Sequence, residues 1–185
     1  MQADTQYDMI TDYITGRQVP DTGAEANRQA VERILVERKG YAPEDIEVDR
    51  KVAFIAGGQH YSSAVDLVVF CGKTALMVIK CAAGSLDSRR KEAVAAARIL
   101  FDPVVPLAAA SDGRTALVFD AVSGKQIGEG LEAIPDARSC RQITEELEPF
   151  SLPEKRLEKE RIIFRSYDIM NVNVCREPGT GGQNP

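Results

Sequence analysis

Apolar residues recur along the chain in two rhythms, one typical of helices and one typical of strands. A strand-rich stretch contains three apolar runs, which are separated by the turn signals Gly57-Gly58 and Gly72-Lys73. Two shorter apolar runs flank Ser111-Asp-Gly113, another turn signal. The pattern therefore predicts strands over 46–56, 63–71, 74–82, 104–110 and 116–121.

Helices are predicted on either side of these strands. Thr22-Gly-Ala-Glu25 has the spacing of a capping box, and a narrow apolar stripe follows it until Gly40. An alanine-rich run of strong helical propensity follows the third strand. Ser151-Leu-Pro-Glu154 is a second capping box, and it precedes a helix whose charges alternate in sign as on a solvated face. The predicted helices are 23–39, 89–101, 139–147 and 153–165.

This order of elements predicts an α/β (α+β) fold, in which a mixed β-sheet is flanked by helices and followed by C-terminal helices. With 185 residues, of which 44% are hydrophobic, the chain can bury a core of ordinary size. The expected organisation is an N-terminal extension over 1–21, a core domain over 22–135, a helical segment over 136–170 packed on it, and a disordered tail over 171–185.

Composition narrows the possible partners. The chain has 23 basic and 28 acidic residues and a net charge of -5, which argues against binding nucleic acid or membranes through overall charge. Any DNA contact would need a local basic patch. The N-terminus is too polar for a signal peptide, and no apolar run approaches the roughly 20 residues that span a bilayer. We therefore expect a cytoplasmic protein without a membrane partner.

The candidate chemistry lies on the central strands. The stretch ANRQAVERILVERKGY is followed by SSAVDLVVF and then by TALMVIKCAAGSL. This succession resembles the N-terminal domain of type I restriction enzyme R subunits, where an arginine-glutamine helix ending in Gly-Tyr precedes an "ADIVV" strand and an "LLVIECKAP" strand. The resemblance covers Thr22 to Leu100. It implies a restriction-endonuclease-like core of the PD-(D/E)xK superfamily over 22–135.

In that superfamily an aspartate and an E-x-K triplet bind Mg2+, which activates water to attack a phosphodiester. The resemblance places the metal-binding aspartate at Asp66, but Lys80 stands where the family has glutamate and Ala82 where it has lysine. The following helix offers Glu92 and Ala96 where the family often has glutamine and tyrosine. The catalytic signature is thus largely erased, and we expect Lys80 to form a structural ion pair with Asp66 on the adjacent strand.

A rearranged active site is the alternative to this loss. Glu25 and Glu32 recur at helical spacing on one face, and related nucleases take an extra metal ligand from this first helix. An active enzyme would bind Mg2+ through Asp66, Glu25 and Glu32 and use Asp66 and Lys80 as its catalytic residues. The other interpretation of the two glutamates is an ordinary solvated helix face.

One local feature favours nucleic acid as a partner. Hydroxyl and basic side chains gather at the start of the alanine-rich helix, where phosphate can be held by helix N–H groups and by arginine. A solvated polar turn is the alternative. The candidate nucleic-acid-binding residues are Ser85, Ser88, Arg89, Arg90 and Lys91.

Three functions stay open at this point. The chain could be a catalytically impaired nuclease-fold module that binds nucleic acid or acts as an accessory module. It could be an active Mg-dependent DNA endonuclease with a rearranged site, or a protein-interaction scaffold subunit with no nucleic-acid role. The expected partners are accordingly DNA or protein subunits. No nucleotide is expected, since the glycine pairs lack the strand-to-helix context of a phosphate loop.

Overall fold

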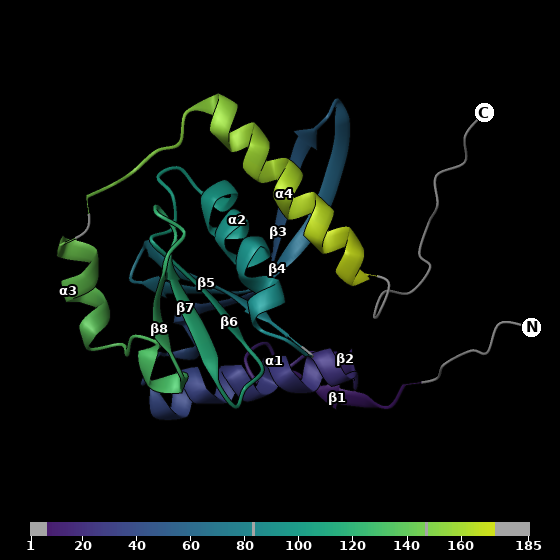
Figure 1. Cartoon of the computed structure of the whole chain (residues 1–185). Coiled ribbons are helices and arrows are strands. Elements are labelled where there is room, and N and C mark those ends of the chain that lie inside the picture. Colours follow the sequence, from purple (N-terminus) through teal and green to yellow (C-terminus); the bar gives the residue numbers. More distant parts are fainter. Residues whose placement is uncertain (1–6, 83, 147, 173–185) are drawn as a thin grey trace, which may run out of the picture.

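The computed structural model describes residues 7–82, 84–146 and 148–172, which form a mixed α/β domain (Figure 1). Its main sheet consists of β3 (Ile46–Ala56), β4 (Gln59–Cys71), β5 (Thr74–Cys81), β6 (Leu107–Ser111), β7 (Ala116–Asp120) and β8 (Gln126–Glu129). These six strands lie side by side in sequential order. Only β5 and β6 are parallel, while every other neighbouring pair is antiparallel. The predicted mixed sheet is confirmed.

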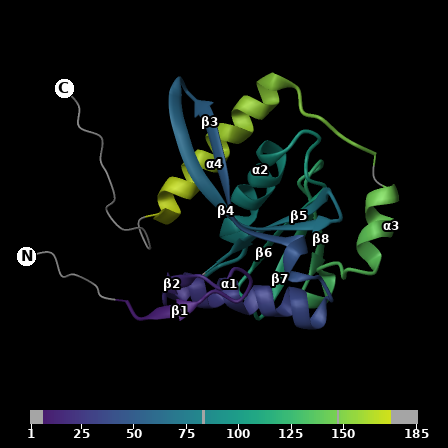
Figure 2. The ribbon, with the colours of Figure 1, turned by 180° about the vertical axis from the view of Figure 1, so that it is seen from behind.

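Helices cover both faces of this sheet (Figures 1 and 2). One face carries α1 and α3, and the other carries α2 and α4. Short one-turn helices lie at Pro43–Asp45, Asp87–Arg89 and Leu131–Ala133. The helices are α1 (Gly23–Arg33), continued by a π-helical turn (Ile34–Arg38), α2 (Arg90–Leu100), α3 (Ser139–Glu146) and α4 (Glu154–Val172).

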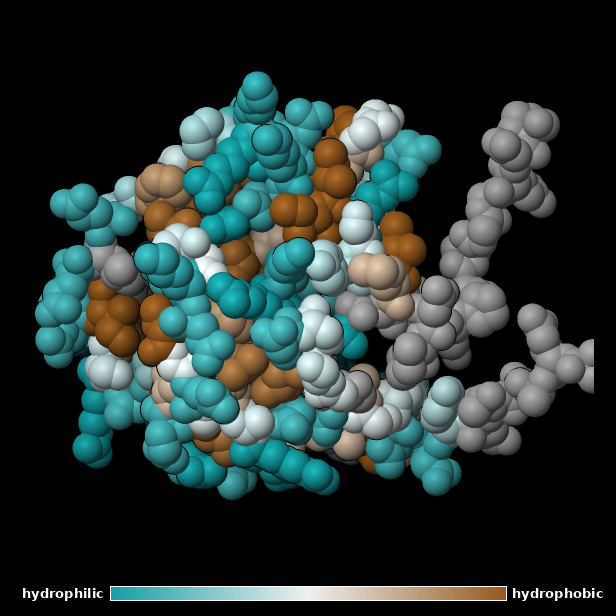
Figure 3. All heavy atoms as spheres, in the orientation of Figure 1, coloured by the Kyte–Doolittle hydropathy of each residue, from teal (hydrophilic) through white to brown (hydrophobic). Residues whose placement is uncertain are grey.

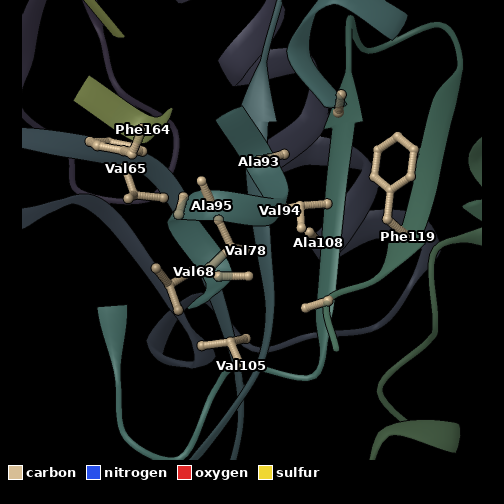
Figure 4. Close-up of a cluster of buried hydrophobic side chains, with 14 of the residues drawn as sticks. Val65, Val68, Val78, Ala93, Val94, Ala95, Val105, Ala108, Phe119 and Phe164 are labelled. Carbon is tan, nitrogen blue, oxygen red and sulfur yellow. The ribbon is translucent and has the colours of Figure 1, made fainter. Parts of the chain in front are cut away.

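The core has two layers because successive strand residues point to opposite faces of the sheet. On β6, Ala108 and Ala110 pack on the α2 side, while Leu107 and Ala109 pack on the α1 side. Figure 4 shows the α2-side layer, where valines of β4 and β5 meet the alanines of α2. The small side chains from Ala93 to Ala97 let this helix approach the sheet closely, with Val94 as the one larger residue among them.

The predicted elements are present, but several bounds differ and some elements were not predicted. Neither β8 nor the separate hairpin of β1 (Met9–Thr11) and β2 (Gln18–Pro20) was predicted, because these strands have only three or four residues. The last helix runs to Val172 and does not end at residue 165. The first two residues of the predicted tail therefore belong to α4, and the rest of it lies outside the described residues.

The hairpin of β3 and β4 extends beyond the rest of the sheet, and α4 crosses it (Figures 1 and 2). Phe164 of α4 is fully buried and meets Phe54 edge-to-face, with ring centroids 6.1 Å apart. Asp168 of α4 accepts a hydrogen bond from the hydroxyl of Tyr61, and Arg165 donates to the carbonyl oxygen of Ala56 at 3.1 Å. The contact of Asp168 holds the part of the helix that continues past residue 165 against the hairpin. Among the described residues, no helix is long and apolar enough to cross a membrane.

Candidate functional site

Two buried ion clusters lie near the central strands. In the first, Lys80 of β5 approaches two carboxylates: its Nζ is 3.0 Å from Asp66 Oδ1 and 3.3 Å from Glu92 Oε1. The other oxygen of Asp66 accepts a hydrogen bond from the backbone N–H of Cys81 at 2.7 Å. Arg89 Nη1 lies 3.3 Å from Glu92 Oε2. We call Asp66, Lys80, Arg89 and Glu92 the Lys80 network. The expected pairing of Lys80 with Asp66 is confirmed.

Burial and charge together fix the ionisation of Lys80. Its side chain is 8% exposed, and those of Asp66 and Glu92 are 25% and 1% exposed. Burial by itself lowers the pKa of Lys80, because it penalises the charged ammonium, but the carboxylates of Asp66 and Glu92 outweigh this and raise the pKa above its ordinary value. Lys80 is therefore protonated at neutral pH between two carboxylates, and Arg89 adds a second cation to the network.

The end of β5 holds this arrangement in place. Ala82 is fully buried on the α2 side, at the position where the family resemblance leads one to expect lysine. Its carbonyl oxygen accepts a hydrogen bond from Asn27 Nδ2 at 2.6 Å, which ties α1 to the end of the strand. Because Ala82 carries only a methyl group where the family has lysine, residue 82 supplies no cation, and Asp66 contacts Lys80 directly.

The second cluster surrounds Arg28 of α1. Its guanidinium lies 3.0 Å from Asp12, 2.8 Å from Glu25, 2.8 Å from Asp49 and 3.5 Å from Glu32. One cation thus meets four carboxylates, which come from the β1–β2 hairpin, from α1 itself and from β3. We call these five residues the Arg28 cluster.

Glu32 is the most strongly affected carboxylate of the Arg28 cluster. It is fully buried, and burial raises its pKa to about 7, with the carboxylates of Asp12 and Glu25 adding to the rise and Arg28 opposing it. Because Glu32 is buried and the cluster has fewer cations than carboxylates, Glu32 is only partly ionised near pH 7.

The two clusters lie back to back across β5. Cys81 follows Lys80 on this strand, so its side chain points to the opposite face. Burial raises the pKa of the Cys81 thiol well above its ordinary value, Asp66 raises it further, and Lys80 and Arg28 lower it. Charged groups of both clusters therefore affect the pKa of this thiol.

Asp49 has an unusual backbone that keeps two carboxylates apart. The pairs Val48↔Leu67 and Arg50↔Val65 set Asp49 opposite Asp66, and directly opposed residues normally share a face of the sheet. Asp49 has φ of 52°, in the left-handed region. Its side chain contacts Arg28, while that of Asp66 contacts Lys80.

The structure separates the residues that the sequence proposed as metal ligands. Asp66 pairs with Lys80, whereas Glu25 and Glu32 pair with Arg28. Within residues 7–82, 84–146 and 148–172, no group of three or more His, Cys, Asp or Glu side chains could hold a metal ion. The roles of Asp66 and Lys80 in catalysis, and of Asp66, Glu25 and Glu32 in Mg2+ binding, stay predictions.

The predicted nucleic-acid-binding residues at the start of α2 do not act together as one group. Ser88 Oγ donates to the carbonyl oxygen of Ser85 at 2.6 Å, and both serines are exposed. Arg89 turns inward to the Lys80 network. Arg90 donates to the carbonyl oxygen of Gly124 at 2.8 Å, and Lys91 is exposed. Nucleic-acid binding by these residues stays a prediction.

Sequence reasoning missed the actual roles of several members of these clusters, among them Arg28 and Glu92. Arg28 stands between Glu25 and Glu32 at spacings of three and four, which is the signal of ion pairs along a helix and could have been recognised. Glu92 was noted only as a substitute for the family's glutamine. Its contact with Lys80 depends on how α2 packs on the sheet, and no local signal reveals that.

A six-stranded mixed sheet flanked by helices, with Asp66 on one central strand beside Lys80 on the next, defines a domain of the nuclease-like α+β class. The comparison with protein families then gives its family. The chain belongs to the family described as the type I restriction enzyme R protein N terminus, whose sequence model matches residues 23–135, more than half of the chain. This confirms the resemblance found in the sequence. No curated protein and no solved structure matches the chain.

Proposed function

We propose that this chain is a catalytically impaired nuclease-fold module that binds nucleic acid without cutting it and serves as an accessory module of a restriction-type assembly. The observation that carries the proposal is the position of Lys80. Its ammonium lies within 3.0 Å of Asp66 and 3.3 Å of Glu92, so a fixed cation occupies the contact that a divalent metal would need at Asp66.

Electrostatics support the loss of metal-dependent cleavage. A divalent cation at Asp66 would lie close to a buried ammonium, and like charges in a poorly solvated site repel strongly. The pKa of Lys80 is raised, so the ammonium does not easily give up its proton to make room for the metal. Mg2+ would have to displace the Lys80 side chain before it could bind.

Cleavage is tested with labelled duplex DNA, supercoiled and linear, incubated with Mg2+ or Mn2+. We expect no cleavage above that of buffer. The double variant Lys80→Glu/Ala82→Lys restores the family's triplet and is the informative comparison, because cleavage by this variant alone would show that the residues at 80 and 82 prevent metal chemistry. Cleavage by the unaltered chain that disappears in Asp66→Asn would overturn the proposal in favour of an active, rearranged endonuclease.

Binding is tested by titrating the same DNA at low and moderate salt. We expect binding that weakens with salt. The variant Arg90→Ala/Lys91→Ala should reduce the magnitude of the negative slope of log association constant against log salt by about 2. Arg17→Ala/Lys51→Ala is the matched control, because it removes two exposed positive charges elsewhere. Absence of binding at low salt would remove the nucleic-acid role.

A scaffold role is the second candidate, and the outer surface of α4 favours it. Ile162 and Ile169 are exposed at a spacing of seven, on the same side of the helix, and Met170 is exposed beside them. Figure 3 shows that the face carrying α4 mixes apolar and hydrophilic side chains. A protein subunit could use such a stripe as an anchor. This reading gains support if DNA binding is absent and Ile162→Glu leaves the melting temperature unchanged but abolishes assembly with a restriction subunit.

A further inference from the structure

A basic pocket lies between α2, α4 and the turn that joins β7 to β8. Its volume is about 280 Å3, below the roughly 300 to 1,000 Å3 of pockets that hold drug-sized ligands. The size suits a small charged group better than a complete nucleotide. Its charged lining residues are Arg90, Lys91, Arg98, Arg156 and Glu160.

The charges in this pocket are unbalanced. Glu160 is the one carboxylate among the lining residues, all of which belong to the described part of the chain. Arg98 neutralises it with a contact of 2.7 Å and donates its remaining hydrogen bonds to the carbonyl oxygens of Ala121 and Val122. Three cations therefore line the pocket beyond this pair, on a chain whose net charge is -5: they are Arg90, Lys91 and Arg156.

The pocket wall is also ordered in advance. Arg90 is held by its hydrogen bond to the carbonyl oxygen of Gly124 and by its position over the ring of Phe119, 5.5 Å from the centroid. A guanidinium fixed in this way loses little side-chain entropy when an anion binds. The hydroxyl of Ser123 lies on the same rim and can donate a further hydrogen bond.

Gly124 keeps the turn close to the pocket floor. It has φ of 71°, and a Cβ at this position would lie 3.4 Å from Arg98 Nη2 and 3.9 Å from Val94 Cγ1. The left-handed turn favours glycine here, while a Cβ would meet Arg98 and Val94 only at ordinary van der Waals distances.

We infer that this pocket holds a phosphate group of the nucleic-acid backbone. The inference rests on the proposed function and gives that function a location, because the phosphate would be held between α2 and α4 by lining residues that do not include Asp66. Guanidinium and ammonium groups bind phosphate oxygens through charge-assisted hydrogen bonds, and Arg156 supplies such a group from a helix far along the chain from α2.

The test compares two single variants of the full chain in duplex titrations over a range of salt. Arg156→Ala removes a pocket cation, and Lys155→Ala removes the neighbouring exposed charge, which does not line the pocket. We expect Arg156→Ala to reduce the magnitude of the negative slope of log association constant against log salt by about 1. Lys155→Ala should change the affinity for the duplex by less than about twofold. Ser123→Asp, an exposed change that adds a carboxylate to the rim, should weaken binding at least as much. Melting temperatures verify that each variant is folded.

The possible outcomes distinguish a failure of the pocket proposal from a failure of the proposed nucleic-acid-binding function. Duplex binding that falls equally in Arg156→Ala and Lys155→Ala overturns the pocket and leaves nucleic-acid binding intact. Absence of duplex binding together with a rise in melting temperature on adding pyrophosphate, lost in Arg156→Ala, overturns the nucleic-acid source and assigns the pocket to free phosphate. If the protein shows no duplex binding and pyrophosphate does not change its melting temperature, both proposals are overturned.

Discussion

The Lys80 network and the Arg28 cluster lie on opposite faces of β5, and they differ in how many cations accompany their carboxylates. The Lys80 network joins two carboxylates to two cations, so its charges balance without any proton uptake. The Arg28 cluster joins four carboxylates to a single guanidinium, and burial of Glu32, reinforced by the carboxylates of Asp12 and Glu25, raises the pKa of Glu32 to about 7. The Arg28 cluster therefore changes its ionisation near neutral pH, because it contains a fully buried carboxylate and has fewer cations than carboxylates.

The largest effect should follow the loss of the only cation in the Arg28 cluster. Arg28→Met leaves four carboxylates without a counter-charge, two of which, Asp12 and Glu32, are almost completely buried. We expect a loss of about 4 kcal/mol in the free energy of unfolding at pH 8, measured by urea denaturation. The loss should shrink at pH 5, where Glu32 is protonated. A loss of equal size at both pH values would contradict the proposed charge excess.

A somewhat smaller effect is expected in the balanced network. Lys80→Met removes the cation between Asp66 and Glu92 but leaves Arg89 in contact with Glu92, so we expect a loss of about 3 kcal/mol. The double variant Lys80→Met/Glu92→Gln removes one charge of each sign and should recover part of this loss. Urea denaturation of both variants measures the difference, and no recovery would show that Lys80 acts mainly through packing.

A gain in stability is expected when Glu32 loses its ability to ionise. The folded pKa of Glu32 is about 7 and its ordinary value is 4.5, so the unfolded chain releases this proton first as pH rises. The free energy of unfolding consequently falls as pH rises from 4.5 to about 7, and the whole loss is present above pH 7. Glu32→Gln should therefore be more stable than the unaltered chain by about 1 to 2 kcal/mol at pH 8. The advantage should vanish below pH 4.5, which melting curves across this range can check.

The smallest effect is expected at a solvated ion pair. Arg161 contacts Glu154 at 2.7 Å, but the Glu154 side chain is 75% exposed. Water screens such a pair, so Arg161→Ala should change the free energy of unfolding by less than about 0.5 kcal/mol. This variant sets the scale for the buried clusters in the same urea experiment. A cost comparable to that of Lys80→Met would undermine the argument that burial decides the difference.

Local signals in the sequence predicted most of the fold. Glycines marked the turns between the strands, and Thr22, whose Oγ1 accepts from the backbone N–H of Glu25 at 3.1 Å, marked the start of α1. The pairing of Asp66 with Lys80 was also predictable, because adjacent strands of known polarity bring their residues together. The Arg28 cluster was not, since Asp12 and Asp49 reach α1 from a hairpin and a strand that are distant in sequence. The pocket at Arg156 was hidden for the same reason.

The position of α4 has a consequence for synthesis of the chain. The family match ends at residue 135, yet the α2 side of the sheet is completed by Phe164, a fully buried residue of the last helix. A nascent chain emerges from its N-terminus, so the hairpin of β3 and β4 and the apolar surface of α2 are made well before the helix that covers them. During that interval the domain exposes a surface on which chaperones or neighbouring chains can act, and a fragment trimmed to the family boundary would keep that surface open permanently.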